Sequence, residues 1–192
     1  PMNYHVTGSI RLGHSKERLQ EFRRVVGMGR YQGMDLDILS PDEIRSRYPF
    51  LETHDLTGAL YDPYDGDIDP AQLTQALAKG ARDLGAKIIR FCPVTAARRE
   101  NDEWVMTTPK GEIRCEYVVN AAGYYAREVG KLFGRDVPMM VMSHQYMLFE
   151  EIPELAAWTR EVGHKLPLLR DVDSSYYLRQ EKSGMNLGPY EK

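Results

Sequence analysis

The feature that most constrains the fold is the stretch from Tyr117 to Ala126, which reads YVVNAAGYYA. An apolar run typical of a buried strand stops there on Ala121, Ala122 and Gly123, and a helical pattern begins directly after them. Three residues with so little side chain allow either tight packing of strand on helix or the approach of a flat ligand or phosphate to the main chain. Spacing alone leaves both interpretations open.

Strand and helix patterns alternate on both sides of this stretch. Helices are expected at 15–28, after a Ser15 cap, at a capping box that joins Ser40 to Glu43, and from Asp69 to a stop at Gly85. A further helix is expected at 124–133. Strands are expected at 4–12, 36–40, 56–62, 86–91, 94–99, 103–108, 112–116, 117–121, 137–150, 166–171, 175–180 and 185–190. The order predicts an α/β middle with mixed or antiparallel sheet at both ends.

The composition is that of an ordinary globular protein. The 192 residues are 42% hydrophobic and 28% charged, with a net charge of −3, which argues against a general nucleic-acid binder. No apolar run approaches the length of a membrane span. Cys92 and Cys115 fit no metal or redox spacing, and we expect two reduced thiols with a packing role.

Two motifs suggest ligand sites that simpler explanations account for. GMGRYQG, at 27–33, has the wrong spacing for a dinucleotide loop and follows an expected helix instead of a strand, which favours an ordinary turn. The acidic turn around Asp65 and Asp69 invites a calcium hypothesis, but its spacing does not match an EF-hand loop. Turn chemistry and helix capping explain these carboxylates without a metal.

Two polar pairs on expected strands could serve a site. His144 and Tyr146 stand two residues apart and would share one strand face, as would Tyr177 and Arg179. An Arg beside a Tyr can hold a carboxylate through paired hydrogen bonds. A half-buried sheet face or an exposed edge strand explains the same patterns without a ligand, so spacing alone assigns no catalytic residue.

Several longer motifs together resemble one family. These are GALYDPYDGDIDPAQLTQALAKGARDLGAKI, PVTAARR, VVNAAGYYAREVG, SHQYMLFEEIP and LPLLRDVDSSYYLRQEKSGMNLGPYE. In this order they are similar to the D-amino-acid oxidase (DAO) superfamily, and within it to the dimethylglycine and sarcosine dehydrogenase group. The resemblance implies FAD-dependent oxidation of a secondary or tertiary N-methyl amino acid, with hydride passing from the N-methyl carbon to the flavin.

The resemblance also implies residues that bind the cofactor. Val94 would contact the adenine side of FAD through its backbone. Ala121, Ala122 and Gly123 would line the cofactor from the end of their strand, so that their missing side chains make room for FAD. Tyr125 stands where many members have Trp after AAGx, which would alter the packing beside the cofactor.

A second group of residues is assigned to the substrate by the same resemblance. His144 would lie near the flavin ring and keep the substrate amine neutral, a role that suits an imidazole. Tyr146 and Tyr177 would contact the substrate, and Arg170 or Arg179 would meet its carboxylate. No metal is implied.

The fold implied by the resemblance is α/β (α+β). A partial FAD-binding Rossmann-like domain of the glutathione-reductase type, without its first βαβ unit, would join a mixed or antiparallel substrate-binding sheet. Residues 1–66 would belong to the substrate-binding domain, 67–135 to the second half of the FAD-binding domain with an inserted β-meander, and 136–192 to the substrate-binding sheet. Because no GxGxxG segment is present, we expect an internal fragment that holds FAD weakly or not at all.

The expected partner is a small N-methyl amino acid, and tetrahydrofolate would act through a separate downstream domain. Neither nucleic acid nor a membrane is expected, and the expected location is the bacterial cytoplasm or the mitochondrial matrix. Three alternatives stay open. They are a non-catalytic relative, such as the regulatory subunit of the pyruvate dehydrogenase phosphatase, another amino-acid oxidase of the superfamily, and a binding module without flavin.

Overall fold

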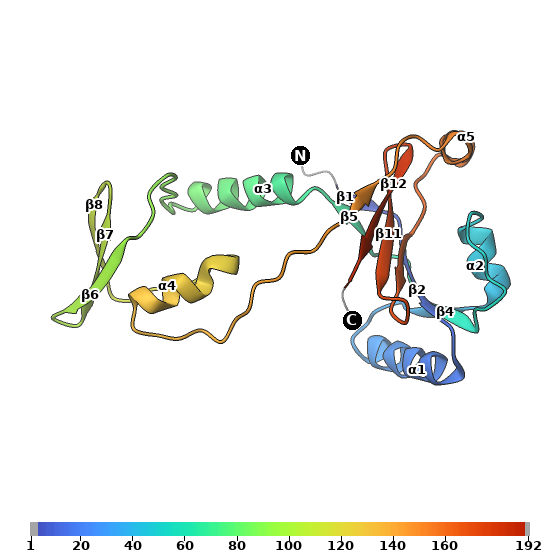
Figure 1. The fold of residues 1–192 in the computed structure, drawn as a ribbon, viewed down its shortest axis with the longest axis horizontal. Coiled ribbons are helices and arrows are strands. Elements are labelled where there is room, and N and C mark those ends of the chain that lie inside the picture. The colour runs from blue at the N-terminus through green and yellow to red at the C-terminus, as the bar shows by residue number, and fades with distance from the viewer. Residues whose placement is uncertain (1–3, 191–192) are drawn as a thin grey trace. The chain divides into compact units, whose positions relative to one another are not determined.

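The computed structural model describes residues 4–190, which divide into two compact units (Figure 1). Unit 1 combines the part of the chain up to Leu77 with the part from His144 onward, and unit 2 is Ala78–Ser143. The two ends of the chain therefore build one unit together, and the segment between them forms the other.

Unit 1 is built around a mixed sheet. Its elements are β1 (Tyr4–Val6), β2 (Ser9–Gly13), α1 (Lys16–Tyr31), β3 (Asp37–Leu39), α2 (Pro41–Arg47), β4 (Gly58–Asp62), β5 (Gly66–Ile68), β9 (Met147–Leu148), α5 (Pro153–Val162), β10 (Leu168–Asp171), β11 (Tyr176–Glu181) and β12 (Gly184–Pro189). Seven strands form the sheet in the order β3-β4-β2-β10-β11-β12-β9, and β1 pairs with β5. A further helix, α3 (Pro70–Asp83), crosses the division between the units.

The two ends of the chain meet in the centre of this sheet. Strand β2 pairs in parallel with β10, whereas all other neighbours in the sheet are antiparallel. Beside this junction, His14 Nε2 lies 2.9 Å from Asp171 Oδ2, and His14 Nδ1 lies 3.3 Å from Asp55 Oδ2. An ion-paired histidine therefore holds together segments that are far apart in the sequence.

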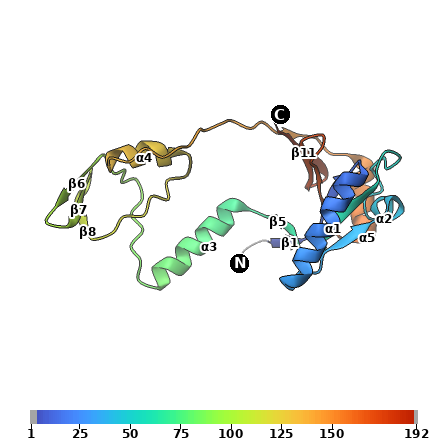
Figure 2. The ribbon, with the colours of Figure 1, turned by 90° about the horizontal axis from the view of Figure 1, so that it is seen from below.

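The sheet of unit 1 has helices on both faces (Figure 2). On one face, Ile10 and Leu12 of β2 pack in a core cluster with Ile44 of α2 and Leu155 of α5. On the other face, Leu60 of β4 packs with the apolar side of α1. The alternation of side chains along a strand explains why neighbouring residues of β2 and β4 serve different cores.

Most helix boundaries follow the local signals in the sequence. The Ser15 side chain caps α1, and Ser40 and Glu43 form the expected capping box of α2. Helix α5 was not predicted from the sequence, although Pro153 stands in its first turn and Gly163 ends it in the left-handed conformation. None of the helices in residues 4–190 is long and apolar enough to cross a bilayer.

Unit 2 contains the expected meander and a short helix. The strands are β6 (Ala96–Glu100), β7 (Glu103–Thr108) and β8 (Gly111–Cys115), paired in the order β6-β7-β8. A 3-10 turn at Gly123–Tyr125 leads into α4 (Ala126–Leu132). The rings of Trp104 and Phe133 meet at 5.1 Å between centroids and join the meander to the end of α4.

Three expected strands are wrong or largely wrong. Residues 86–91 and 117–121 form no strand, and of 137–150 only Met147–Leu148 pairs, with β12. A strand pattern describes side chains, but a strand also needs a neighbour that accepts its backbone hydrogen bonds. Within residues 4–190 the first two segments have no such neighbour. The shared strand face expected for His144 and Tyr146 is therefore not formed.

Candidate functional site

A row of side chains crosses the sheet of unit 1. The strand register aligns Leu60, Arg11, Arg170, Tyr177 and Gly188 on β4, β2, β10, β11 and β12. Residues directly opposite each other on neighbouring strands share a face. All five therefore lie on the same face of the sheet, and α1 packs on the part of that face formed by β4. The part of this face that carries Arg170 and Tyr177 lines a cavity.

A cavity of about 350 Å³ lies on this face. Three of the predicted site residues, Arg170, Tyr177 and Arg179, line it. The remaining lining residues are Gly66, Asp67, Ile68, Leu168, Leu169, Leu178, Asn186 and Tyr190. Its volume is within the usual range of small-molecule sites.

Tyr190 connects the cavity to the predicted catalytic histidine. The Tyr190 ring lies 5.7 Å from the Tyr177 ring and 5.4 Å from the His144 ring, edge to face with the imidazole. Tyr190 therefore joins His144 and Tyr177 in one aromatic cluster. Tyr146 lies just before β9, is 60% exposed, and is not among the residues that line the cavity.

The cavity face carries uncompensated positive charge. Arg11 and Arg170 are direct partners on β2 and β10, and neither forms an ion pair with any residue of 4–190. The acid that lines the cavity, Asp67, is held by Lys165 and His5. Burial alone would raise the pKa of the Asp67 carboxyl, but these two partners hold it below its usual 3.8. A carboxylate ligand would therefore find unpaired cations here.

Two buried polar atoms in the cavity wall have no partner. Arg179 donates from Nη2 to Glu181 Oε2 at 2.8 Å, but its Nε is buried without an acceptor. Asn186 stands opposite Arg179 on β12, and its buried Oδ1 accepts no hydrogen bond. Unsatisfied buried groups of this kind are uncommon in folded proteins and often mark a functional position.

Gly188 gives Tyr177 its place in the row. A Cβ atom at position 188 would overlap the outer part of the Tyr177 ring, so the ring lies directly over the glycine. Sequence reasoning missed Gly188, Asn186 and Tyr190. Only the longer motif that ends in MNLGPYE contains them, because the strand register decides which of these side chains meet.

Unit 2 contains a separate, more apolar cavity of about 810 Å³. Four of the predicted cofactor residues, Val94, Ala121, Ala122 and Tyr125, line it. Gly123 has φ +59° and would direct a Cβ atom into open space. The remaining lining residues are Pro93, Met106, Tyr117, Val118, Val119, Asn120, Glu128, Val129, Leu132 and Phe133. Apolar walls beside a side-chain-poor main chain suit a flat aromatic ring, whereas none of these described lining residues is a Lys, Arg or His that could pair with a pyrophosphate.

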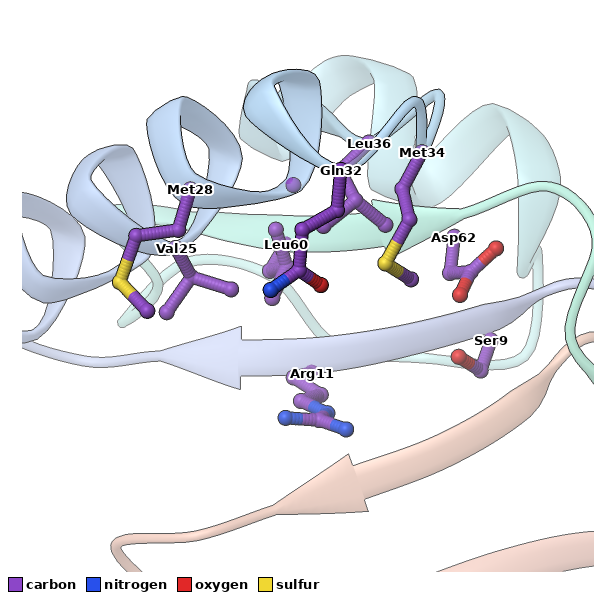
Figure 3. A pocket seen from close by; sticks show the side chains of 10 residues that line it. Ser9, Arg11, Val25, Met28, Gln32, Met34, Leu36, Leu60 and Asp62 are labelled. Atoms are coloured by element: carbon purple, nitrogen blue, oxygen red, sulfur yellow. The ribbon is translucent and has the colours of Figure 1, made fainter.

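A third cavity lies between α1 and the sheet and contains none of the predicted residues. It measures about 190 Å³ and is lined by Val25, Met28, Gln32, Met34 and further residues of α1, β2 and β4 (Figure 3). In Figure 3 the guanidinium of Arg11 lies on the other side of β2 from Gln32 and Met34. Arg11 itself lines this cavity, and it is not among the residues that line the cavity beside Arg170.

The acidic turn is explained by local hydrogen bonds. Asp69 Oδ1 accepts the backbone N–H groups of Ala71 and Gln72 and caps α3, as expected. Asp65 Oδ1 accepts the N–H of Gly66. Within residues 4–190, no group of three His, Cys, Asp or Glu side chains could hold a metal ion.

Comparison with known proteins decides the family. The sequence profile of the DAO family, described as FAD dependent oxidoreductase, matches residues 1–192. The chain belongs to the DAO family of FAD-dependent oxidoreductases.

Relatives within the DAO family include two amine dehydrogenases. Dimethylglycine dehydrogenase of Rattus norvegicus is 42% identical over 99% of this chain, and sarcosine dehydrogenase of Homo sapiens is 35% identical over 96%. Both relatives carry the word mitochondrial in their names. The chain spans about a fifth of their length, 22% and 20% respectively.

A solved structure of the DAO family supports the same fold. L-proline dehydrogenase from P.horikoshii matches with a TM-score of 0.81 and 25% identity, over 97% of this chain and 49% of that chain. The mixed α/β fold expected from the sequence is therefore confirmed. The family description makes FAD the expected cofactor, and the apolar cavity of unit 2 fits its flat, ring-bearing parts.

Proposed function

We propose that the protein containing this chain oxidises an N-methyl amino acid of the dimethylglycine or sarcosine type. The observation that carries the proposal is the cavity on the sheet of unit 1, where Arg170, which forms no ion pair within residues 4–190, lies opposite Tyr177 in the cluster of Tyr177, Tyr190 and His144. Such a substrate has a carboxylate that needs a cation and an amine whose protonation must be controlled. We assign the first requirement to arginines of this face and the second to His144, which contacts the Tyr190 ring.

The roles of the side chains follow from their chemistry. Arg170, with Arg11 beside it, binds the substrate carboxylate, and Arg179 supplies a further donor. His144 accepts a proton from the substrate ammonium, because only a neutral amine has the lone pair that assists loss of hydride. Tyr177 orients the substrate, and Tyr190 holds the rings of Tyr177 and His144 in place.

FAD, when bound, supplies the acceptor for the hydride that leaves the N-methyl carbon. The residues of this chain that would contact it are Val94, Ala121, Ala122, Gly123 and Tyr125. Their contribution is to leave main chain and apolar surface open to a planar ring. We propose that residues 67–135 belong to the cofactor-binding domain, and that 1–66 and 136–192 belong to the substrate-binding domain.

The products and location of the reaction extend the proposal. Loss of hydride leaves a substrate iminium, which either is hydrolysed or gives its one-carbon unit to tetrahydrofolate in a separate domain. The mitochondrial names of the relatives favour the mitochondrial matrix if the source is a eukaryote. For a bacterial source we propose the cytoplasm.

The proposal is tested with the full-length protein. After purification, its absorbance in the flavin region is recorded with and without added FAD, and dimethylglycine, sarcosine and proline are then added separately without oxygen. Rapid bleaching by an N-methyl amino acid supports the proposal. A protein that takes up no FAD would instead favour a non-catalytic relative, and bleaching by proline alone would favour another amino-acid oxidase.

The assignment of His144 as proton acceptor predicts the effect of His144→Ala. Flavin bleaching at neutral pH should slow by roughly 100-fold, the usual contribution of a positioned base. The rate should recover as the pH rises toward the pKa of the free substrate amine. Rapid-mixing spectrophotometry from pH 6 to 10 measures this. His54→Ala, on an exposed loop residue, is the control. An unchanged rate at neutral pH would remove His144 from this role.

A further inference from the structure

Asn186 occupies a position in the cavity wall that no local interaction explains. Its side chain is 7% exposed, and its Oδ1 has no hydrogen-bond partner. Asn186 stands directly opposite Arg179, whose Nε is also buried and unpaired. The wall therefore presents one unused acceptor next to one unused donor.

Gln180 shows what a satisfied amide in this sheet looks like. It neighbours Arg179 on β11 and is 2% exposed. Its Oε1 accepts the N–H of Leu166, and its Nε2 donates to Thr159 and to the carbonyl of Lys182. A buried amide with a structural role uses its oxygen, whereas the buried Oδ1 of Asn186, a residue that lines the cavity, has no partner.

The missing partner must combine two chemical features. It needs an acceptor for the Arg179 N–H and a donor for the Asn186 oxygen, separated by about the span of neighbouring strands. An amino acid meets both requirements, because its carboxylate accepts hydrogen bonds and its amine N–H donates one.

We propose that Asn186 Oδ1 accepts a hydrogen bond from the N–H of the substrate amine, and that Asn186 thereby favours secondary over tertiary amines. This inference rests on the proposed function. A neutral secondary amine such as sarcosine keeps one N–H for Asn186. A neutral tertiary amine such as dimethylglycine has none and leaves the buried oxygen unpaired, which costs binding.

The experiment compares two replacements of Asn186 in the full-length, flavin-loaded protein. Asn186→Leu keeps the size but removes the acceptor, and Asn186→Asp keeps an acceptor oxygen. The preference for sarcosine over dimethylglycine, measured as the ratio of kcat/KM values, should fall roughly five- to tenfold in Asn186→Leu. It should be retained in Asn186→Asp. An equal change of kcat/KM for both substrates in Asn186→Leu would overturn the proposal.

Stability provides a second readout that separates substrate contact from structure. Replacing an unpaired polar group by an apolar one of similar shape costs little, so Asn186→Leu should keep the urea midpoint of the wild type. The matched control, Gln180→Leu, breaks three hydrogen bonds and should lower that midpoint clearly. If Asn186→Leu lowers it as much as Gln180→Leu does, the Asn186 oxygen is satisfied inside the protein, and the proposal is wrong.

Measurements of equilibrium binding test the role of Asn186 separately from the proposed oxidation. Calorimetry measures the Kd values of sarcosine and dimethylglycine for wild type and for Asn186→Leu. If wild type is bleached by neither substrate, the proposed function fails. The inference then still predicts tighter binding of sarcosine, with the difference removed in Asn186→Leu. Equal Kd values for the two amines in the wild type would contradict it.

Discussion

Tyr177 owes its position to the absence of a side chain opposite it. The ring lies over Gly188, so a methyl group at 188 must push it aside. The atoms that would be displaced are at the outer end of the ring, where a small rotation relieves the overlap. Gly188 is therefore a positioning residue for Tyr177, although it contacts no ligand itself.

This arrangement predicts different outcomes for two glycine replacements. Gly188→Ala should lower the rate of flavin reduction but cost less than about 1.5 kcal/mol of unfolding free energy, the usual cost of an off-rotamer side chain. Gly184→Ala should cost about 2–3 kcal/mol, because its Cβ would overlap the backbone of Phe149 and Glu150, which cannot rotate away. Urea unfolding and stopped-flow absorbance measure the two effects. Normal flavin reduction in Gly188→Ala would show that the ring position is not required.

Replacing Arg170 should weaken the binding only of ligands that carry a carboxylate. Arg170→Met removes a charge-assisted hydrogen bond of about 1.5–3 kcal/mol, so the Kd for an N-methyl amino acid should rise roughly 10- to 100-fold. Dimethylethanolamine has no carboxylate, and its weak binding should be unaffected. Calorimetry gives both values, and Arg23→Met on the exposed side of α1 controls for the lost surface charge. Equal weakening of both ligands would exclude Arg170 as the carboxylate partner.

At the residue scale, the resemblance named side chains with obvious chemistry, and their roles stay predictions. His144, Tyr177, Arg170 and Arg179 stand in distinctive motifs, and the structure brings Tyr177 and both arginines to one cavity, with His144 joined through Tyr190. Asn186 could not be found in the same way. A lone Asn in a strand becomes informative only when the register shows what lies opposite it.

At the scale of elements, the junction of β2 and β10 is joined by the pair of His14 and Asp171. Burial alone would lower the pKa of the His14 imidazole, but the hydrogen bond and charge of Asp171, with the charge of Asp55, raise it above the usual 6.5. Burial alone would raise the pKa of the Asp171 carboxyl, but hydrogen bonds from Ser174 and His14 lower it below 3.8. The pair therefore stabilises unit 1 when both groups are charged.

The sign of the pH dependence follows from these shifts. Because the pKa of His14 is raised on folding, its contribution is complete below about pH 6.5 and is lost as the pH rises through the folded value. The free energy of unfolding should fall by about 1–2 kcal/mol over that range in wild type and stay flat in His14→Gln. Urea unfolding followed by Trp158 fluorescence in a Trp104→Phe background reports on unit 1. His54→Gln should behave like wild type, and a flat wild-type curve would contradict the pairing.

Local signals predicted the elements whose stability is local. The Ser15 cap of α1, the capping box of α2 and the Asp69 cap of α3 each depend on residues close together in the sequence, and the structure confirms them. The meander was equally accessible, because short turns join its strands. The segments at 86–91 and 117–121 carry strand patterns but pair with nothing in residues 4–190, so their pairing could not be judged from their own residues.

At the scale of the whole molecule, these two segments predict where the chain is least protected. Residues 87–91 and 117–120 donate no backbone hydrogen bond within the described chain, and Phe91, Tyr117 and Val119 are each at least 85% exposed. Their amides should exchange with deuterium orders of magnitude faster than those of β11. Mass spectrometry of peptides from this chain and from the full-length protein measures this.

The exchange rates of this chain and of the full-length protein must be compared to show whether the two segments find strand partners in the longer protein. If strands elsewhere in the longer protein pair with 117–120, exchange there should slow strongly in the full-length protein, while β11 stays unchanged. Slow exchange in this chain alone would show that the segments already have partners. Equal, fast exchange in both proteins would argue against a cofactor-binding sheet that includes residues 117–120.

The parallel pairing of β2 with β10 also determines when the sheet of unit 1 can form during synthesis. Strand β2 leaves the ribosome long before its parallel neighbour β10, because most of this chain lies between them in the sequence. Until β10 is made, the backbone N–H and C=O groups on one edge of β2 are unpaired and can bind the strands of other chains. Nascent polypeptides halted midway should therefore depend on chaperones, and a premature stop codon before residue 168 should yield aggregates instead of a smaller soluble product.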